Sequence, residues 1–351
     1  MRTHARGFWG AAAAAVVLLP LMAGCGNDDD GDDGGAGADE GGGTLTIYSG
    51  REEDLIGPLF EDFSEETGIE VEVRYGDSAD LALLIDEEGD NSPADVFISQ
   101  SPGAVGFLAE QGRLAEIDES VLEQVAEGDA AEDGTWVGLS GRVRTLVYNT
   151  DLVDPATLPD SVLDLTDEQY AGQVALAPTN ASFQDFVTVL RVQLGEDEAQ
   201  AWLDGMAAGD PPTFDGNTAI VEAVGRGEVP MGLVNHYYAA RALAEDPDLP
   251  VANHFFPEGD YGSTLLVTAG AIIEGTDDAD AAAQLLDFLL SEEAQTYFSQ
   301  ETFEYPLASG VEPPEGVPPF DEVPKTRVDL SELGGGLAAT TEMIDASGLT
   351  R

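Results

Sequence analysis

The sequence predicts an α/β fold of two lobes, with mixed sheets flanked by helices and two crossing strands that form a hinge. Three observations support this prediction. In the first part of the body, short β-rich runs alternate with segments of helical periodicity, which is typical of a sheet covered by helices. A second set of such segments follows residue 150. Two long extended stretches, residues 136–150 and 263–274, show no helical pattern and are predicted to cross between the lobes.

The N-terminal part is predicted to be a targeting signal and a tether. Basic residues precede an apolar run from Gly7 to Met22 that ends in LMAGC, which is typical of a secretory signal and too short for a transmembrane span. We therefore assign residues 1–24 to a lipoprotein signal peptide and expect a lipid on Cys25, the alternative being a free thiol. Residues 25–43 are rich in glycine and carboxylates and are expected to be a flexible tether.

The first lobe is predicted to begin with a strand at 44–50 that ends at a glycine. A helix follows, ending at Gly68, in which these apolar residues recur at helical spacing: Leu55, Ile56, Leu59, Phe60 and Phe63. Strands are expected at 69–76 and 94–99, with a helix after each, the second at 103–112. Ligands of such sheets collect where strands end and helices begin.

The second lobe follows the first crossing. Its predicted elements are a strand at 173–177, a long helix at about 182–205, a helix at 217–225 and a strand at 229–234. After the return crossing, residues 282–298 have the pattern of one amphipathic helix, and the last thirty residues that of a closing helix.

These elements predict how the chain divides. We assign residues 44–143 plus 264–317 to lobe 1 and residues 144–263 plus 318–351 to lobe 2.

The charge balance limits the partners. Asp and Glu number 69 against 13 Lys and Arg, for a formal net charge of −56, which argues against nucleic acid and anionic lipid. The excess acid is either a solvation device for saline surroundings or an attractant for cations, and we favour the first because most charges fall on predicted outer helix faces. The single cysteine excludes an internal disulfide and a thiol-bound metal site.

Two adjacent tyrosines, Tyr237 and Tyr238, follow the apolar run GLVN and precede an alanine-rich helical segment. In a strand their hydroxyls would point to opposite faces. Just past a strand end, with Asn235 as the helix N-cap, both lie in the first helical turn and can meet one ligand. The residues alone leave open the alternative that one ring packs in the core and the other lies at the surface.

Six strings carry a resemblance to a known family: TLTIYSGR, SPADVFISQ, GLSGRVRTLVYNT, APTNASFQDFV, NHYY and EYPL. In order and spacing they resemble the bacterial ferric-ion-binding lipoproteins of iron ABC importers, over about residues 44–350. The resemblance implies a type II periplasmic-binding fold and implies that Tyr237 and Tyr238 give two phenolates to one ferric ion. The chemistry agrees, because Fe(III) prefers charged oxygen donors and removes the phenol proton on contact.

The other family ligands are not retained in place. Alignment puts Glu52 or Arg51 where relatives often have histidine, and Gln100 where they often have glutamate. Glu52 is either a ligand or a solvated acid of the first helical turn. Uncharged Gln100 is a poor ligand for Fe(III) and is expected to hydrogen-bond the ligand or a water. Beside the tyrosines, His236 is expected to support the site rather than to ligate.

A helper anion is therefore expected to complete the coordination, because many relatives use carbonate or phosphate. Helix N-termini after predicted strands favour anions, and Arg142 offers a guanidinium fork, although it could instead pair with a structural carboxylate. The predicted anion-binding residues are Arg142, Asn180, Ala181, Ser182, Asn217 and Asn235. The backbone N–H groups of Asn180, Ala181 and Ser182 are expected to point into the cleft, with the positive end of the helix behind them.

Three functions are possible for a chain of this kind. The favoured one is a monomeric, lipid-anchored receptor on the extracellular face of the cell membrane that binds Fe(III) with an anion and delivers it to an ABC permease. The alternative is the same scaffold with a polyamine, thiamine or oxyanion in the cleft. An enzyme is disfavoured, because the sequence shows no Ser–His–Asp order, phosphate loop or zinc signature.

Overall fold

The computed structural model describes residues 43–126, 128–308, 310–314, 316–328, 333 and 336–350. The predicted signal peptide, Cys25 and nearly all of the predicted tether lie outside the described residues. None of the described helices combines the length and apolar character that a membrane crossing needs.

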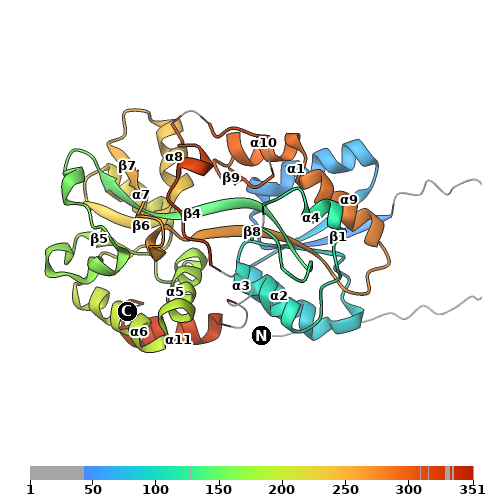
Figure 1. Ribbon diagram of the computed structural model, residues 1–351, viewed down its shortest axis with the longest axis horizontal. Coiled ribbons are helices and arrows are strands. Elements are labelled where there is room, and N and C mark those ends of the chain that lie inside the picture. The colour runs from blue at the N-terminus through green and yellow to red at the C-terminus, as the bar shows by residue number, and fades with distance from the viewer. Residues whose placement is uncertain are drawn as a thin grey trace, which may run out of the picture. The chain divides into compact units, whose positions relative to one another are not determined.

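A nine-stranded mixed sheet runs through the body (Figure 1). Its main path has the order β2-β1-β3-β8-β4-β6-β5, and β7 and β9 each pair with β4 off this path. β1 pairs in parallel with β2 and β3, whereas β8 pairs antiparallel with β3 and β4. The strands are β1 Thr44–Ser49, β2 Glu70–Tyr75, β3 Val96–Ser99, β4 Val137–Asn149, β5 Val174–Ala175, β6 Met231–Asn235, β7 Val251–His254, β8 Leu265–Ile272 and β9 Tyr305–Pro306.

The long strand β4 and its neighbour β8 form the two predicted crossings. The first part of β4, Val137–Val143, pairs with β8. Its second part, Arg144–Asn149, pairs with β6 and β7 on the other side of the body. In Figure 1 both strands run through the middle, with α1, α9 and α10 toward one end and α5, α6, α7 and α8 toward the other.

Helices cover the sheet in both halves. They are α1 Glu53–Thr67, α2 Ser78–Glu88, α3 Pro102–Glu110, α4 Glu119–Leu122, α5 Ala181–Leu194, α6 Glu196–Ala208, α7 Asn217–Gly225, α8 His236–Glu245, α9 Ala279–Leu289, α10 Glu292–Gln300 and α11 Leu337–Ser347. Short 3-10 turns lie at Gly89–Asn91, Pro155–Thr157, Val162–Thr166, Glu168–Tyr170, Tyr261–Ser263 and Phe320–Glu322.

Two predicted long helices are each divided in two. The helix expected at 182–205 breaks at Gly195, whose φ of 96° lies in the left-handed region that glycine adopts without strain. The helix expected at 282–298 breaks before Ser291, whose side chain accepts the N–H of Ala294 as the N-cap of α10. Both single-helix predictions were wrong, because a local stop or start signal outweighs continuous apolar spacing.

Apolar residues gather on both faces of the sheet in each half. In one half, Phe63 of α1 meets Phe288 of α9 with ring centroids 5.6 Å apart. In the other, Phe186 of α5 meets Trp202 of α6 at 5.5 Å, edge to face. A third buried cluster includes Val189 of α5 together with apolar residues of α2, α3 and β8, so the two halves are in contact. The residue boundaries of the two lobes stay a prediction.

Candidate functional site

Two adjoining cavities lie between the β1–α1 loop of one half and the N-termini of α5 and α7 in the other. They have Glu52, Asn180 and Asp215 in common. The first, of about 550 Å³, is lined by Gly50, Arg51, Glu52, Tyr75, Gly76, Asp77, Ser78, Ala79, Gln100, Ser101, Thr179, Asn180, Ala181, Gln184, Asp185 and Asp215. The second, of about 410 Å³, is lined by Glu52, Asp54, Leu55, Asn180, Asp215, Gly216, Asn217, Thr218, Tyr237, Tyr238 and Arg241.

The tyrosine pair lies where the sequence predicts it, just past a strand end. β6 ends at Asn235 and α8 begins at His236, so both tyrosines occupy the first helical turn. Their rings stack, with centroids 4.2 Å apart and planes 28° apart, and both line the second cavity. Tyr237 is 2% exposed and Tyr238 is half-buried. The two rings therefore lie against each other at the wall of one cavity, which is compatible with a pair of ligands to one ion.

The capping prediction for Asn235 was wrong in one respect. Asn235 occupies the N-cap position of α8 with extended backbone, but its side chain makes no capping hydrogen bond. Its Oδ1 instead accepts from Nη1 of Arg144, at 3.3 Å. The amide is thus committed to an arginine beneath the tyrosine pair.

Burial keeps the proton of Tyr237 in place at neutral pH. Removal from water raises the pKa of Tyr237 well above 10, and the neighbouring Tyr238 adds to this effect. The positive charges of Arg51 and Arg142 act in the opposite direction. At neutral pH the Tyr237 phenol therefore stays protonated unless a strong positive charge displaces its proton.

Three arginines beside the tyrosines are almost fully buried. Arg51, Arg142 and Arg144 are each 1% exposed. Among the described residues, some of their N–H groups have no hydrogen-bond partner: Nε of Arg51, Nε and Nη1 of Arg142, and Nε and Nη2 of Arg144. Buried donors without partners are costly, so this arrangement suits an anion that accepts from them.

Arg144 is a site residue that sequence reasoning missed. Its Nη1 donates to Ser182 Oγ and to Asn235 Oδ1, both at 3.3 Å, and its guanidinium lies over the ring of Phe186. Burial lowers its pKa to about 10, so it remains charged at neutral pH. The string GRVR contained the signal, because residues two apart in a strand share a face and Arg144 follows Arg142 by two.

The predicted anion-binding residues of the second half form one polar network. Asn217, 2% exposed, donates from Nδ2 to Asn180 Oδ1 at 3.2 Å and to Ser182 Oγ at 3.0 Å. Ser182 also receives the Arg144 bond. The Oδ1 of Asn217 has no partner among the residues that the structure describes. Asn180 and Ala181 line the first cavity.

Two of the three predicted backbone donors are already engaged. The N–H of Asn180 donates to Ala177 O at 3.0 Å, in a turn. The N–H of Ser182 donates to Asn180 Oδ1 at 3.1 Å, because Asn180 is the N-cap of α5. The prediction that both N–H groups point at an anion was therefore wrong. The backbone N–H of Ala181 is the predicted donor that is not engaged in this way, and Arg144 lies behind the turn through its bond to Ser182 Oγ.

Arg142 faces the first half. Its Nη2 donates to the carbonyl oxygens of Gln100 and Val267. It therefore bonds two backbone groups rather than the structural carboxylate that was the alternative. Gln100 accepts at Oε1 from Nη1 of Arg51, at 3.5 Å, so its side chain is held by an arginine.

The two carboxylates that line both cavities are exposed. Glu52, at the N-cap position of α1, and Asp215, which sequence reasoning did not single out, line both cavities. Among the described residues, no three His, Cys, Asp or Glu side chains gather as a metal site. Ligation by Glu52 stays a prediction.

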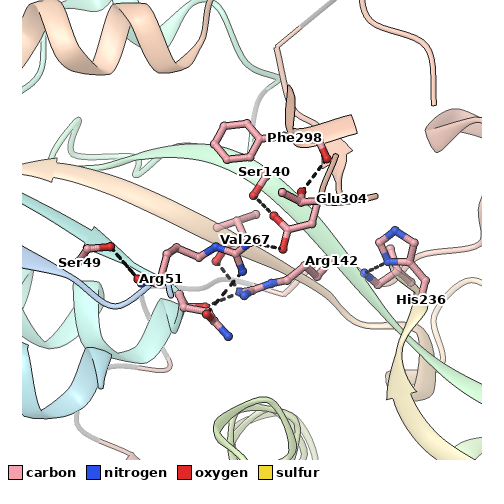
Figure 2. A network of polar contacts seen from close by, with 11 residues as sticks. Ser49, Arg51, Ser140, Arg142, His236, Val267, Phe298 and Glu304 are labelled. Carbon is pink, nitrogen blue, oxygen red and sulfur yellow. Dashed lines mark hydrogen bonds and ion pairs between the residues drawn. The ribbon is translucent and has the colours of Figure 1, made fainter. Parts of the chain in front are cut away.

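The buried carboxylate of Glu304 forms an ion pair with Arg51 (Figure 2). Glu304 is 1% exposed, with Oε1 3.0 Å from Nη2 of Arg51 and Oε2 accepting from Ser140 Oγ at 2.5 Å. Burial acts to lower the pKa of Arg51, but the charges of Glu304, Tyr237 and Tyr238 raise it overall. Arg51 thus lies close enough to both phenols for their charges to interact.

His236 supports the helix that carries the tyrosines. Its Nδ1 accepts the N–H of Val143 at 3.2 Å, and its ring stacks on Tyr305 with centroids 4.3 Å apart. Burial lowers its pKa to about 3, so the ring is neutral at physiological pH. It lines neither cavity.

Asp185 of α5 joins the two halves by accepting from Ser101 Oγ at 2.6 Å. Burial raises its pKa to about 6, although the Ser101 bond and Arg142 act against this rise. The folded state therefore binds a proton more tightly than the unfolded state, whose aspartate titrates near 3.8. Stability from this group is present at low pH and is lost as pH rises through 6.

We expect Asp185→Asn to remove this pH dependence. Between about pH 4 and pH 7 the wild type should lose about 2 kcal/mol of unfolding free energy relative to the variant. Urea unfolding at both pH values measures it, with exposed Asp151→Asn as the control. Equal differences at the two pH values would contradict the expected titration.

The chain matches known proteins along most of its length. Residues 91–322 match the family described as bacterial extracellular solute-binding protein. The chain is 31% identical over 313 residues to iron uptake protein A1 of Synechocystis sp., covering 87% of each chain. It is similar to the crystal structure of iron-bound HitA from Pseudomonas aeruginosa, with a TM-score of 0.80, 31% identity and coverage of 87% of this chain and 99% of that one. It is also similar to a Trichodesmium protein in complex with iron and citrate, with a TM-score of 0.75 and 28% identity. That match covers 87% of this chain and 99% of the other.

These neighbours are type II periplasmic binding proteins, which confirms the predicted fold class. The resemblance to ferric-iron-binding proteins is confirmed as well, and the family consists of binding proteins rather than enzymes. The chain belongs to the bacterial extracellular solute-binding proteins.

Proposed function

We propose that this protein binds Fe(III) together with an anion between its two halves and delivers the iron to an ABC importer. The observation that carries the proposal is the stacked pair of Tyr237 and Tyr238 at the cavity wall. Two phenolates offset two of the three charges of Fe(III), and a carboxylate such as Glu52 offsets the third. Relatives described as iron uptake and ferric iron-binding proteins support this cargo.

The anion is carbonate or phosphate in this proposal. Three buried guanidiniums, of Arg51, Arg142 and Arg144, are balanced by two buried carboxylates, of Glu304 and Asp185. One positive charge remains, and an oxyanion beside the iron would satisfy both this charge and the donors without partners. The citrate in the Trichodesmium complex indicates that a carboxylate anion suits a related site.

The protein works at the outer face of the cell membrane in this proposal. A lipid on Cys25 and the acidic tether of residues 25–43 would hold the body near the permease without inserting it. The strongly acidic body would remain apart from anionic headgroups. Release of an unanchored protein by Cys25→Ser would support the anchor.

Mixing the iron-free protein with Fe(III) citrate and bicarbonate at neutral pH should give a red-brown colour. The colour comes from charge transfer between phenolate and iron, and a visible absorption spectrum measures it. Acidification should bleach it, because protons compete for the phenolates. A colourless protein that still binds a solute would instead favour another cargo on the same scaffold.

A further inference from the structure

One short segment contacts both halves of the site. Residues 303 and 304 lie between α10 and β9, and Tyr305 is the first residue of β9, which pairs with β4. Glu304 reaches Arg51, next to the predicted ligand Glu52, and Tyr305 stacks on His236, next to the tyrosine pair. Figure 2 shows Glu304 between Ser140 and Arg51, with His236 beyond Arg142. None of these links is local in sequence, since Ser140 and Glu304 are 164 residues apart.

The backbone is strained where this segment begins. Phe303 has a φ of 61°, in the left-handed region that a bulky residue rarely adopts. Such strain persists only where surrounding contacts fix it, and it concentrates at functional positions. Here the strained residue directly precedes Glu304, whose N–H donates to Phe298 O at 3.0 Å.

The buried ion pair between Arg51 and Glu304 contributes little to stability by itself. Both side chains are 0% exposed, and removing two charges from water offsets most of their attraction. A pair of apolar side chains would fill the same space at lower cost. The ion pair fixes the guanidinium of Arg51 in place. Its Nη2 pairs with Glu304 and its Nη1 donates to Gln100, while its Nε has no partner among the described residues.

We propose that Glu304 is a positioning residue: it fixes Arg51 beside the tyrosine pair so that Fe(III) binds tightly only together with an anion. A fixed positive charge near the phenols repels a bare trivalent ion and attracts an anion that bridges Arg51 and the metal. If Arg51 could move away, iron would bind with less dependence on the anion. This inference rests on the proposed iron-binding function.

The test measures iron affinity by competition with a chelator, with and without bicarbonate, in the wild type and in Glu304→Gln. The glutamine keeps the shape and an acceptor for Ser140 but removes the charge. With bicarbonate present, we expect iron affinity to fall by about 10- to 100-fold, as for loss of an outer partner of a metal site. The gain in affinity that bicarbonate gives the wild type should shrink at least about tenfold, while the phenolate colour per bound iron persists.

Asp129→Asn is the matched control. Asp129 is 1% exposed and forms an ion pair with Arg327, and neither residue lines the two cavities. Its loss also breaks an ion pair of a buried carboxylate, although Arg327 is itself 36% exposed, and the bicarbonate effect should stay as in the wild type. An equal loss of the bicarbonate effect in both variants would reduce Glu304 to a structural role.

A second variant covers the case in which Glu304→Gln does not fold. Arg51→Gln combined with Glu304→Gln leaves no unpaired buried charge and should also lose the bicarbonate effect. An unchanged bicarbonate effect in any folded Glu304 variant overturns this inference and leaves the iron proposal intact. A wild type without phenolate colour overturns the iron proposal itself.

Discussion

Tyr237→Phe and Tyr238→Phe should each abolish tight iron binding. Each variant removes one hydroxyl and leaves the ring, so the stack with its neighbour and the first turn of α8 are retained. The site then keeps one phenolate for an ion of charge three. Loss of a charged ligand should weaken iron binding by more than the roughly 10- to 100-fold that outer partners contribute. Competition with a chelator measures the iron affinity, and the visible absorption band measures phenolate coordination.

Tyr170→Phe is the control for these variants. Tyr170 is 8% exposed, and its hydroxyl donates to Thr157 O at 3.2 Å, away from both cavities. The Tyr170→Phe variant also loses one phenol hydroxyl, but it should keep the phenolate colour and the iron affinity of the wild type. Wild-type iron affinity in both Tyr237→Phe and Tyr238→Phe would show that the pair is not the metal site, whatever the fold.

Arg144→Met should separate anion binding from stability. Methionine fills a similar volume and removes a buried charge whose pKa burial has already lowered to about 10. The unfolding free energy should therefore change by less than about 2 kcal/mol, because relief of desolvation offsets the hydrogen bond that Arg144 no longer donates to Asn235 Oδ1. Iron affinity in bicarbonate should nevertheless fall by about 10- to 100-fold, since a charged donor to the anion is gone.

Arg226→Met is its control. Arg226 is 54% exposed and pairs only with exposed glutamates, so neither iron affinity nor stability should change appreciably. Denaturant unfolding and chelator competition on the same preparations give both numbers. A large loss of stability in Arg144→Met without loss of the bicarbonate effect would place Arg144 in the core rather than in the anion site.

The sequence predicts those parts of the site that depend on local order. Tyr237 and Tyr238 could be placed because the period changes from strand to helix at Asn235. The position of Asn217 at the start of α7 was predicted for the same reason. The breaks at Gly195 and Ser291 also had local signals, a glycine before an acidic run and the string SEEA, but continuous apolar spacing concealed them.

Residues that act through distant contacts could not be placed in this way. Glu304 meets Arg51 because β9 and β1 belong to one sheet. The string EYPL does not indicate which charged residue contacts the glutamate. The N–H groups of Asn180 and Ser182 were assigned to an anion, whereas the chain uses them to close its own turn and cap. Side-chain capping competes with ligands for the same donors, and spacing alone does not decide between them.

The pairing of β4 with β8 bears on how far the two halves of the protein can open. The ladder between them continues into the junction, where the N–H of Arg144 donates to Thr264 O at 3.0 Å. The two halves are thus linked by a pair of hydrogen-bonded strands rather than by a flexible linker. Opening of the two halves would twist these paired strands, and the resistance of the strands to twisting would limit how far the halves open.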